Sequence, residues 1–296
     1  MSSEPDPLRL ATRGSRQALA QANVVAAAVA AKSGREVDLV LVETTGDARQ
    51  DVPLHTIGGQ GVFVKEVQRA VVDGRADLAV HSAKDLPSEP APGLTIAAFT
   101  ERRSPHDVLV GSRLDDLAHG ATVASGSVRR RAQLAAVRPD LRFVELRGNI
   151  DTRLTKIPEG GAIVMARAAL EILELTHRID EVLDRVRFVP AVGQGCVAVE
   201  CRSDDAATRN ALSTVDHAAT RYAVEVERAY LAELGSGCSL PVAGHVLDGA
   251  LHAFLADPER NRWVGEVVEL DGSAVDRDGD LQRARAAARR VQDLLG

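Results

Sequence analysis

Lys84 and Asp85 place opposite charges side by side after a short apolar run, residues 78–80, and shortly before Pro87. An apolar run that ends in polar residues and a proline is typical of a buried strand entering a loop. In an open α/β sheet, ligands bind beyond the carboxyl ends of the strands, where this pair could act on a substrate. Taken alone, the pair is more typical of a solvated surface ion pair, which is common and weak.

Arginines stand beside small or hydroxylated residues at three further places where a predicted strand runs into a predicted helix. These groups are Arg13 with Ser15, Ser125 and Ser127 with Arg129 and Arg130, and Arg147 with Arg153. A helix start offers free N–H groups to an anion, and the planar arginine side chain fits carboxylates and phosphates. One such group is explained by helix capping and a surface ion pair. Three groups favour a ligand with several negative charges.

Cys238 lies in a loop of small residues, 235–239, where a bound group could approach closely. A lone cysteine is usually a buried, small apolar residue. The loop therefore leaves two interpretations open, packing or covalent chemistry. Cys196 and Cys201 are five positions apart. Residues at an odd separation in a strand face opposite sides, so this pair is a poor metal site and no metal is expected.

The composition is that of a soluble globular protein, with 45% hydrophobic and 26% charged residues. Aromatic residues make up 3% and the net charge is −6, which argues against a nucleic-acid partner. No apolar run approaches the ~20 residues that cross a bilayer, and the acidic start does not resemble a signal peptide. We therefore expect a cytoplasmic protein without a membrane partner. The glycines match neither nucleotide-binding fingerprint, so ATP or NAD dependence is not expected.

Strand and helix patterns alternate through the first hundred residues. Strand patterns at 8–12 and 37–44 flank a helix pattern that starts after Ser15 and ends at Gly34. Strand, helix, strand is the βαβ unit of a parallel sheet. Residues 47–61 are rich in glycine and lack periodicity. A loop of this length inside a compact domain is more often functional, for example as a lid, than idle.

A second α/β region follows residues 101–105, with strands predicted at 121–124, 143–146 and 162–166. A second crossing at 188–195 leads into a strand that we expect to return to the first sheet. The predicted fold class is α/β, with two lobes, a cleft between them and a small C-terminal α+β domain. The predicted boundaries are 1–103 with 195–215 for domain 1, 104–194 for domain 2 and 216–296 for domain 3.

Eight short segments follow one another in a specific order and spacing. They are Ala-Thr-Arg-Gly-Ser (11–15), Gly-Val-Phe-Val-Lys-Glu (61–66), His-Ser-Ala-Lys-Asp-Leu-Pro (81–87), Ser-Val-Arg-Arg (127–130), Leu-Arg-Gly-Asn-Ile-Asp-Thr-Arg-Leu (146–154), Pro-Ala-Val-Gly-Gln-Gly (190–195), Val-Glu-Cys-Arg (199–202) and Gly-Cys-Ser-Leu-Pro-Val (237–242). Together they resemble the hydroxymethylbilane synthase (porphobilinogen deaminase) family over nearly the whole chain, from Leu10 to about Val246.

The resemblance implies two lobes like those of a periplasmic binding protein, a third domain and a monomer. It implies a transferase that joins four porphobilinogen molecules head to tail onto a covalent dipyrromethane cofactor. Ammonia leaves at each step, and hydrolysis then releases hydroxymethylbilane. Porphobilinogen carries acetate and propionate groups, which match the predicted anionic ligand. The alternative is a non-catalytic two-lobed anion-binding or sensor protein, which would need neither Cys238 nor the third domain.

The resemblance assigns roles to individual residues, all of which except Asp47 lie in these segments. Asp85 is the catalytic carboxylate, which would stabilise the cation left when ammonia departs. Cys238 carries the dipyrromethane cofactor through a thioether. The other cofactor-binding residues are Lys84, Ser127, Arg129, Arg130 and Asp47, and the substrate-binding residues are Arg13, Ser15, Arg147, Arg153 and Gln194. The 47–61 loop is the expected lid.

The chain departs from the family pattern at three positions. Gln60 stands where some members have lysine, and Cys196 replaces the usual alanine. Ile172 stands where the family usually has an arginine that helps to bind substrate. Two interpretations follow for Ile172: impaired elongation or substrate affinity, or compensation by Arg167.

Overall fold

The computed structural model describes residues 6–44, 64–235, 241–272 and 276–296. These residues form two compact units. The first unit contains 6–44, 64–103 and 196–221, and the second contains 104–195 and the described residues from 222 to 296. The expected lid, Asp47 and Cys238 lie outside the described residues. The division into three domains stays a prediction.

A five-stranded sheet forms the centre of the first unit. Its strands are β1 (Leu8–Arg13), β2 (Val37–Val42), β3 (Leu78–Ser82), β4 (Leu94–Phe99) and β10 (Val197–Arg202). Their order across the sheet is β2-β1-β3-β10-β4. β1 is parallel to β2 and β3, whereas β10 is antiparallel to β3 and β4. The predicted βαβ unit and the predicted return of the later strand to this sheet are both confirmed.

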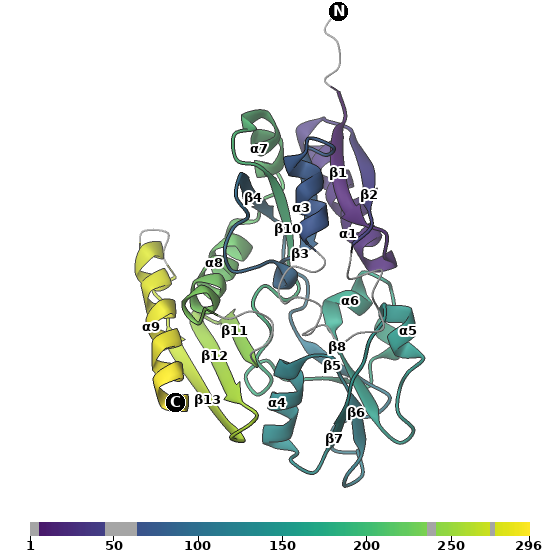
Figure 1. Ribbon diagram of the computed structural model, residues 1–296, viewed down its shortest axis with the longest axis vertical. Coiled ribbons are helices and arrows are strands. Elements are labelled where there is room, and N and C mark those ends of the chain that lie inside the picture. Colours follow the sequence, from purple (N-terminus) through teal and green to yellow (C-terminus); the bar gives the residue numbers. More distant parts are fainter. Residues whose placement is uncertain (1–5, 45–63, 236–240, 273–275) are drawn as a thin grey trace, which may run out of the picture. The chain divides into compact units, whose positions relative to one another are not determined.

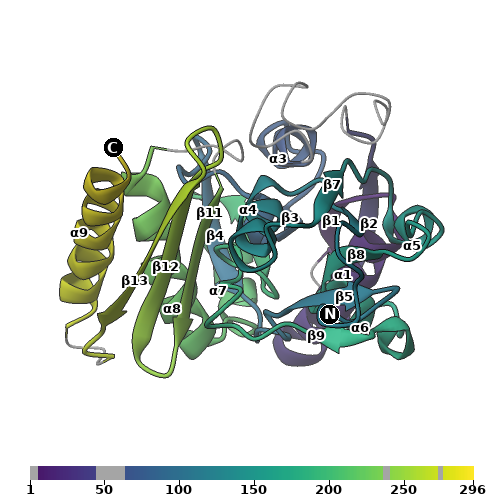
Figure 2. The same cartoon turned by 90° about the horizontal axis from the view of Figure 1, so that it is seen from below.

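Helices cover both faces of this sheet (Figures 1 and 2). α1 (Arg16–Ser33) and α7 (Ala206–Ser213) pack on one face, and α3 (Lys65–Val72) packs on the other. Because successive strand residues point to opposite faces, Leu10 lies under α1 while its neighbour Ala11 lies under α3. β1 and β3 are therefore buried from both sides, as is usual for parallel strands.

The ends of α1 follow from local residue chemistry. Ser15 has an extended backbone, and its hydroxyl oxygen accepts a hydrogen bond from the Ala18 amide over 3.3 Å. This cap satisfies one of the free N–H groups of the first turn. Gly34 adopts φ 72°, a left-handed conformation that glycine reaches without steric cost, and ends the helix. Both predicted helix ends are confirmed.

A second five-stranded sheet lies in the second unit. Its strands are β5 (Asp107–Val110), β6 (Thr122–Ala124), β7 (Arg142–Val144), β8 (Ala162–Ala166) and β9 (Glu181–Val182). The order is β7-β6-β8-β5-β9, which repeats the pattern of the first sheet. The connecting helices are α4 (Val128–Val137), α5 (Ile150–Leu154), α6 (Arg167–Glu171) and the 3₁₀ turn η3 (Thr176–Arg178). The antiparallel strand β5 was not among the predicted strands.

An antiparallel three-stranded sheet completes the second unit (Figure 2). It consists of β11 (Val242–Leu247), β12 (Ala250–Asp257) and β13 (Arg262–Glu269), with α8 (Ala218–Glu233) and α9 (Arg277–Leu295) packed on one face. The α/β fold class with a small C-terminal α+β region is confirmed. No helix in the described ranges combines the length and apolar character that crossing a bilayer would require.

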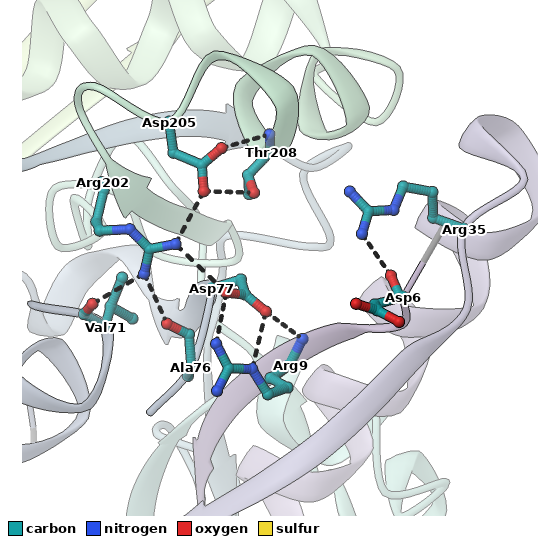
Figure 3. Close-up of polar contacts among 9 residues, drawn as sticks. All are labelled: Asp6, Arg9, Arg35, Val71, Ala76, Asp77, Arg202, Asp205 and Thr208. Carbon is teal, nitrogen blue, oxygen red and sulfur yellow. Dashed lines mark hydrogen bonds and ion pairs between the residues drawn. The ribbon is translucent and has the colours of Figure 1, made fainter. Parts of the chain in front are cut away.

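Arg202 connects three elements of the first unit (Figure 3). Its guanidinium donates to the carbonyls of Val71 and Ala76 over 3.1 and 2.9 Å, and so holds the end of α3 to the end of β10. It also contacts Asp77 over 3.3 Å and Asp205 over 2.9 Å. Burial raises the pKa of Asp77, but hydrogen bonds from Arg9 and Arg202 outweigh burial, so that the pKa lies below its ordinary value.

Replacing Arg202 with alanine is expected to lower the free energy of unfolding by about 2 kcal/mol, because two carbonyls and two carboxylates lose a shared donor. Urea denaturation measures the change. The control is Arg69→Ala, which removes a pair between Arg69 and Asp73 whose side chains are 77% and 45% exposed. Such a pair contributes only about 0.3 to 0.5 kcal/mol. Equal effects of the two substitutions would show that Arg202 does not fasten α3 to β10.

Candidate active site

The carboxyl ends of β1 and β3 bring two groups of predicted residues to one edge of the first sheet. Arg13 is the last residue of β1, and Ser15 caps the helix that follows. Lys84 and Asp85 lie in η2 (Ala83–Asp85), a 3₁₀ turn directly after β3. Because β1 and β3 are parallel neighbours, their ends meet at the edge where open α/β sheets bind ligands.

Two hydrogen bonds fix the turn that carries Asp85. The Ala83 amide donates to the carbonyl of Cys196 over 2.9 Å. The side chains of Ser82 and Gln21 are bonded over 3.2 Å. The turn is thus attached to the start of β10 on one side and to α1 on the other, and its position is set by the sheet.

The side chain of Asp85 is half-buried. Within the described part of the chain, it makes no hydrogen bond and no ion pair. A carboxylate whose charge no described side chain neutralises can stabilise a cation that develops on a substrate. It can also accept hydrogen bonds from N–H groups and carry a proton.

A buried polar group lies directly before this turn. His81 Nε2 is 3.1 Å from Glu200 Oε2, and the Gln68 amide donates to the same oxygen over 2.8 Å. All three residues are buried, so the group links β3, β10 and α3 in the interior of the first unit. Sequence reasoning gave these residues no role. The one available indication of a role was that His81 begins the segment 81–87, which resembles the family.

The parallel strands of the second sheet place the remaining predicted residues at their carboxyl ends. Ser127 follows β6 and caps α4, accepting a hydrogen bond from the Arg130 amide over 3.4 Å. Arg147 follows β7. Arg153 lies in α5, and its Nε donates to the Gly148 carbonyl over 2.8 Å. The structure thus groups these residues at one edge of the second sheet, as the sequence predicts.

Arg129 and Arg130 share one buried carboxylate. Arg129 Nη1 lies 2.8 Å from Asp107 Oδ2, and Arg130 Nη2 lies 2.8 Å from Asp107 Oδ1. Burial raises the pKa of Asp107, but the charges of the two arginines outweigh burial and hold the pKa well below its usual range. Asp107 is therefore ionised at neutral pH. Sequence reasoning missed this residue because it did not predict β5.

Gln194 is turned into the interior of the second unit and is 1% exposed. Its side-chain nitrogen donates to the Pro105 carbonyl over 2.7 Å and to Asp107 Oδ1 over 2.9 Å. A side-chain amide carries two N–H donors, and both are used in these bonds. The neighbouring Gly193 amide donates to the buried Glu227 over 2.8 Å, which fixes the loop to α8.

Ile172 follows α6 directly. Arg167, the first residue of that helix, pairs with Glu171 over 2.9 Å, and Glu171 also accepts a hydrogen bond from the Ser104 amide over 3.3 Å. Arg167 therefore lies at the end of β8 with its charge partly neutralised. Whether Arg167 compensates for Ile172 stays a prediction.

Cys196 and Cys201 are the two cysteines among the described residues, and both are buried. Burial raises the pKa of Cys201 to about 11. Its thiol is therefore protonated at neutral pH, whereas the thiolate is the reactive form of cysteine.

Comparison with known proteins gives one consistent result. The family model described as "Porphobilinogen deaminase, dipyromethane cofactor binding domain" matches residues 8–210. A porphobilinogen deaminase of Nitratidesulfovibrio vulgaris (strain DP4) is 45% identical over 278 residues, covering 90% of this chain and 88% of the relative. A probable porphobilinogen deaminase of Methanopyrus kandleri is 42% identical over 280 residues, covering 92% and 94%. The solved methionine-binding protein MetQ matches 70% of this chain and 89% of its own length, at 13% identity and a TM-score of 0.45.

Proposed function

We propose that Asp85 is the catalytic carboxylate of this chain, because the chain belongs to the porphobilinogen deaminase family. The chain is a transferase that joins four porphobilinogen molecules head to tail onto a dipyrromethane cofactor. It releases ammonia and then hydroxymethylbilane. No observation favours the alternative, a non-catalytic binding protein. The observation that carries the role of Asp85 is a half-buried carboxylate, without a partner among the described residues, on a fixed turn at the carboxyl edge of a sheet.

The described residues fit a cofactor that carries carboxylates. Arg129 and Arg130 together bear two positive charges and share a single carboxylate, Asp107. We assign cofactor binding to Arg129, Arg130, Ser127 and Lys84, with Asp47 and the attachment residue Cys238 outside the described residues. When bound, dipyrromethane supplies the pyrrole carbon to which the first substrate unit is joined.

Asp85 acts through its charge and its oxygens. As the substrate loses ammonia, positive charge develops on its pyrrole, and the Asp85 carboxylate stabilises that charge. Its oxygens accept hydrogen bonds from the pyrrole N–H, which orient the ring. They also take up the proton that leaves the ring after the new bond has formed.

The carboxyl edges of the two sheets supply donors for the acetate and propionate groups of the substrate. We assign this binding to Arg13, Ser15, Arg147, Arg153 and Gln194. Helix starts and arginine side chains are both suited to carboxylates. The side-chain N–H groups of Gln194 already donate to Pro105 and Asp107, so binding of a substrate carboxylate by Gln194 requires one of these donors to leave its present partner.

Replacing Arg147 or Arg153 with glutamine is expected to arrest elongation at intermediate chain lengths, because each arginine binds the carboxylates of a particular pyrrole unit. Intact-mass measurement after a short exposure to porphobilinogen would show stalled covalent adducts. Arg142→Gln, an exposed residue at the opposite end of β7, is the matched control. An equal slowing of every elongation step would contradict separate binding positions.

We propose that the protein works in the cytoplasm as a monomer, without nucleic-acid or membrane partners. The two free, buried cysteines among the described residues are in keeping with a reducing compartment. Sedimentation of the purified chain with its cofactor tests the monomeric state, and a concentration-dependent mass would contradict it.

A further inference from the structure

Asp107 lies at the edge of the second sheet where the candidate binding residues gather. It is the first residue of β5, which runs antiparallel to β8, and it pairs with Ala166, the last residue of β8. The antiparallel direction of β5 therefore brings a carboxylate to the carboxyl ends of the parallel strands. The carboxylate stands beside the first turn of α4, which carries Arg129 and Arg130.

Both oxygens of the Asp107 carboxylate are used. Oδ2 contacts Arg129, whereas Oδ1 accepts hydrogen bonds from Arg130 Nε over 3.0 Å and from Gln194 Nε2 over 2.9 Å. A carboxylate held from several sides has one orientation, and so have the two guanidiniums bonded to it. These four residues, Asp107, Arg129, Arg130 and Gln194, are called the Asp107 cluster below.

The Asp107 cluster carries an excess of one positive charge. The other contacts of the two arginines are neutral, because Arg129 donates to the Val189 carbonyl over 2.8 Å and Arg130 to the Val164 carbonyl over 3.2 Å. Within the described ranges, no second carboxylate contacts either guanidinium. Arg129 is 5% and Arg130 is 9% exposed. A buried, uncompensated charge is unfavourable, so the cluster gains stability when one anionic group arrives.

We infer that Asp107 is a positioning residue that sets the charge of the Arg129–Arg130 pair, so that the pair receives one carboxylate of the pyrrole cofactor. The inference rests on the proposed role of these arginines in cofactor binding. Gln194 holds Asp107 in place as a neutral donor and leaves the charge balance unchanged. With Asp107 alone as counter-ion, the cluster keeps one excess positive charge before cofactor loading, and a cofactor carboxylate neutralises that charge after loading.

Thermal unfolding of cofactor-free and cofactor-loaded protein tests the charge balance, with loading by porphobilinogen verified by intact mass. The measured quantity is the rise in apparent melting temperature on loading. Asp107→Asn raises the cluster charge to two and is expected to enlarge this rise by about 5 °C, because the cofactor-free form is destabilised more than the loaded form. Arg130→Gln removes the excess charge and is expected to reduce the rise.

The double variant Asp107→Asn with Arg130→Gln restores a single excess charge, and its rise is expected to return toward that of the unmodified protein. If Asp107→Asn alone does not fold, the double variant still tests whether Asp107 sets the charge of the cluster. If the role of Asp107 were purely structural, Asp107→Asn would lower the melting temperatures of the cofactor-free and cofactor-loaded forms equally. The double variant would then show no larger rise on loading than Arg130→Gln alone. Either result, or failure of folded Asp107→Asn to load, overturns the inference.

Asp140→Asn is the matched control, because Asp140 is also an arginine-paired carboxylate of the second unit. It lies 2.8 Å from Arg138 and contacts neither Arg129 nor Arg130. The rise in melting temperature of Asp140→Asn on loading is expected to equal that of the unmodified protein. If Arg130→Gln leaves the rise unchanged, the proposed cofactor role of the arginines fails. If Arg130→Gln reduces the rise and Asp107→Asn does not enlarge it, only the inference about Asp107 fails.

Discussion

Replacement of Asp85 by asparagine is expected to slow the conversion of porphobilinogen by about 1,000-fold while the fold stays intact. A carboxylate stabilises a positive charge by about 4 kcal/mol at a separation of ~4 Å and an effective dielectric near 20, which corresponds to roughly three orders of magnitude in rate. Asparagine has the same shape without the charge. Because Asp85 makes no ion pair or hydrogen bond within the described residues, its replacement breaks no structural contact there.

Ammonia release in a single turnover measures the chemical step for this variant, and the melting temperature reports on the fold. Glu89→Gln is the control, since Glu89 is an exposed carboxylate four residues beyond Asp85. It is expected to react at the rate of the unmodified protein. If Asp85→Asn kept more than about a tenth of the rate, less than about 1.4 kcal/mol would be assigned to its charge, and another group would have to stabilise the cation.

Cys238→Ser is expected to abolish covalent attachment of the cofactor completely, and activity with it. The two other cysteines are unsuited to attachment, because Cys196 is 2% and Cys201 is 0% exposed. The raised pKa of the Cys201 thiol, about 11, keeps it protonated. Cys238 is the remaining thiol of the sequence, and it lies outside the described ranges.

Intact mass of the purified protein provides the measurement for Cys238→Ser. The unmodified chain is expected to exceed its sequence mass by two condensed pyrrole units, and the variant is expected to show no excess. Cys196→Ala and Cys201→Ala are the matched controls and are expected to keep the adduct. An adduct on Cys238→Ser, or its loss in either control, would place the attachment elsewhere.

Local patterns in the sequence were sufficient for much of the fold. The βαβ unit at the start of the chain was predicted, and so were the two ends of its helix α1, at Ser15 and Gly34. These features depend on residues a few positions apart. The return of the strand at 197–202 to the first sheet was also predicted correctly. The grouping of arginines at strand ends followed from the same alternation of strands and helices.

Contacts between residues far apart in the sequence could not be predicted from local patterns. Asp107 is 22 positions from Arg129 and 87 from Gln194, and its strand is only four residues long. The apolar run Val108-Leu109-Val110 between Pro105 and Gly111 was the signal for that strand. Neither its antiparallel direction nor its neighbour β8 is encoded locally. Arg129 and Arg130 were therefore assigned to a ligand without their internal counter-ion.

The position of β10 has a consequence for how the chain folds during synthesis. β4 pairs with β10 and with no other described strand, yet about a hundred residues separate the two in the chain. A nascent chain that has been made as far as β4 therefore exposes that strand, and one edge of β3, until residues 197–202 leave the ribosome. The second sheet lies wholly within residues 107–182 and can close earlier. Synthesis thus favours completion of the second sheet before the first, and the late strand β10 determines when the edge that carries Asp85 becomes complete.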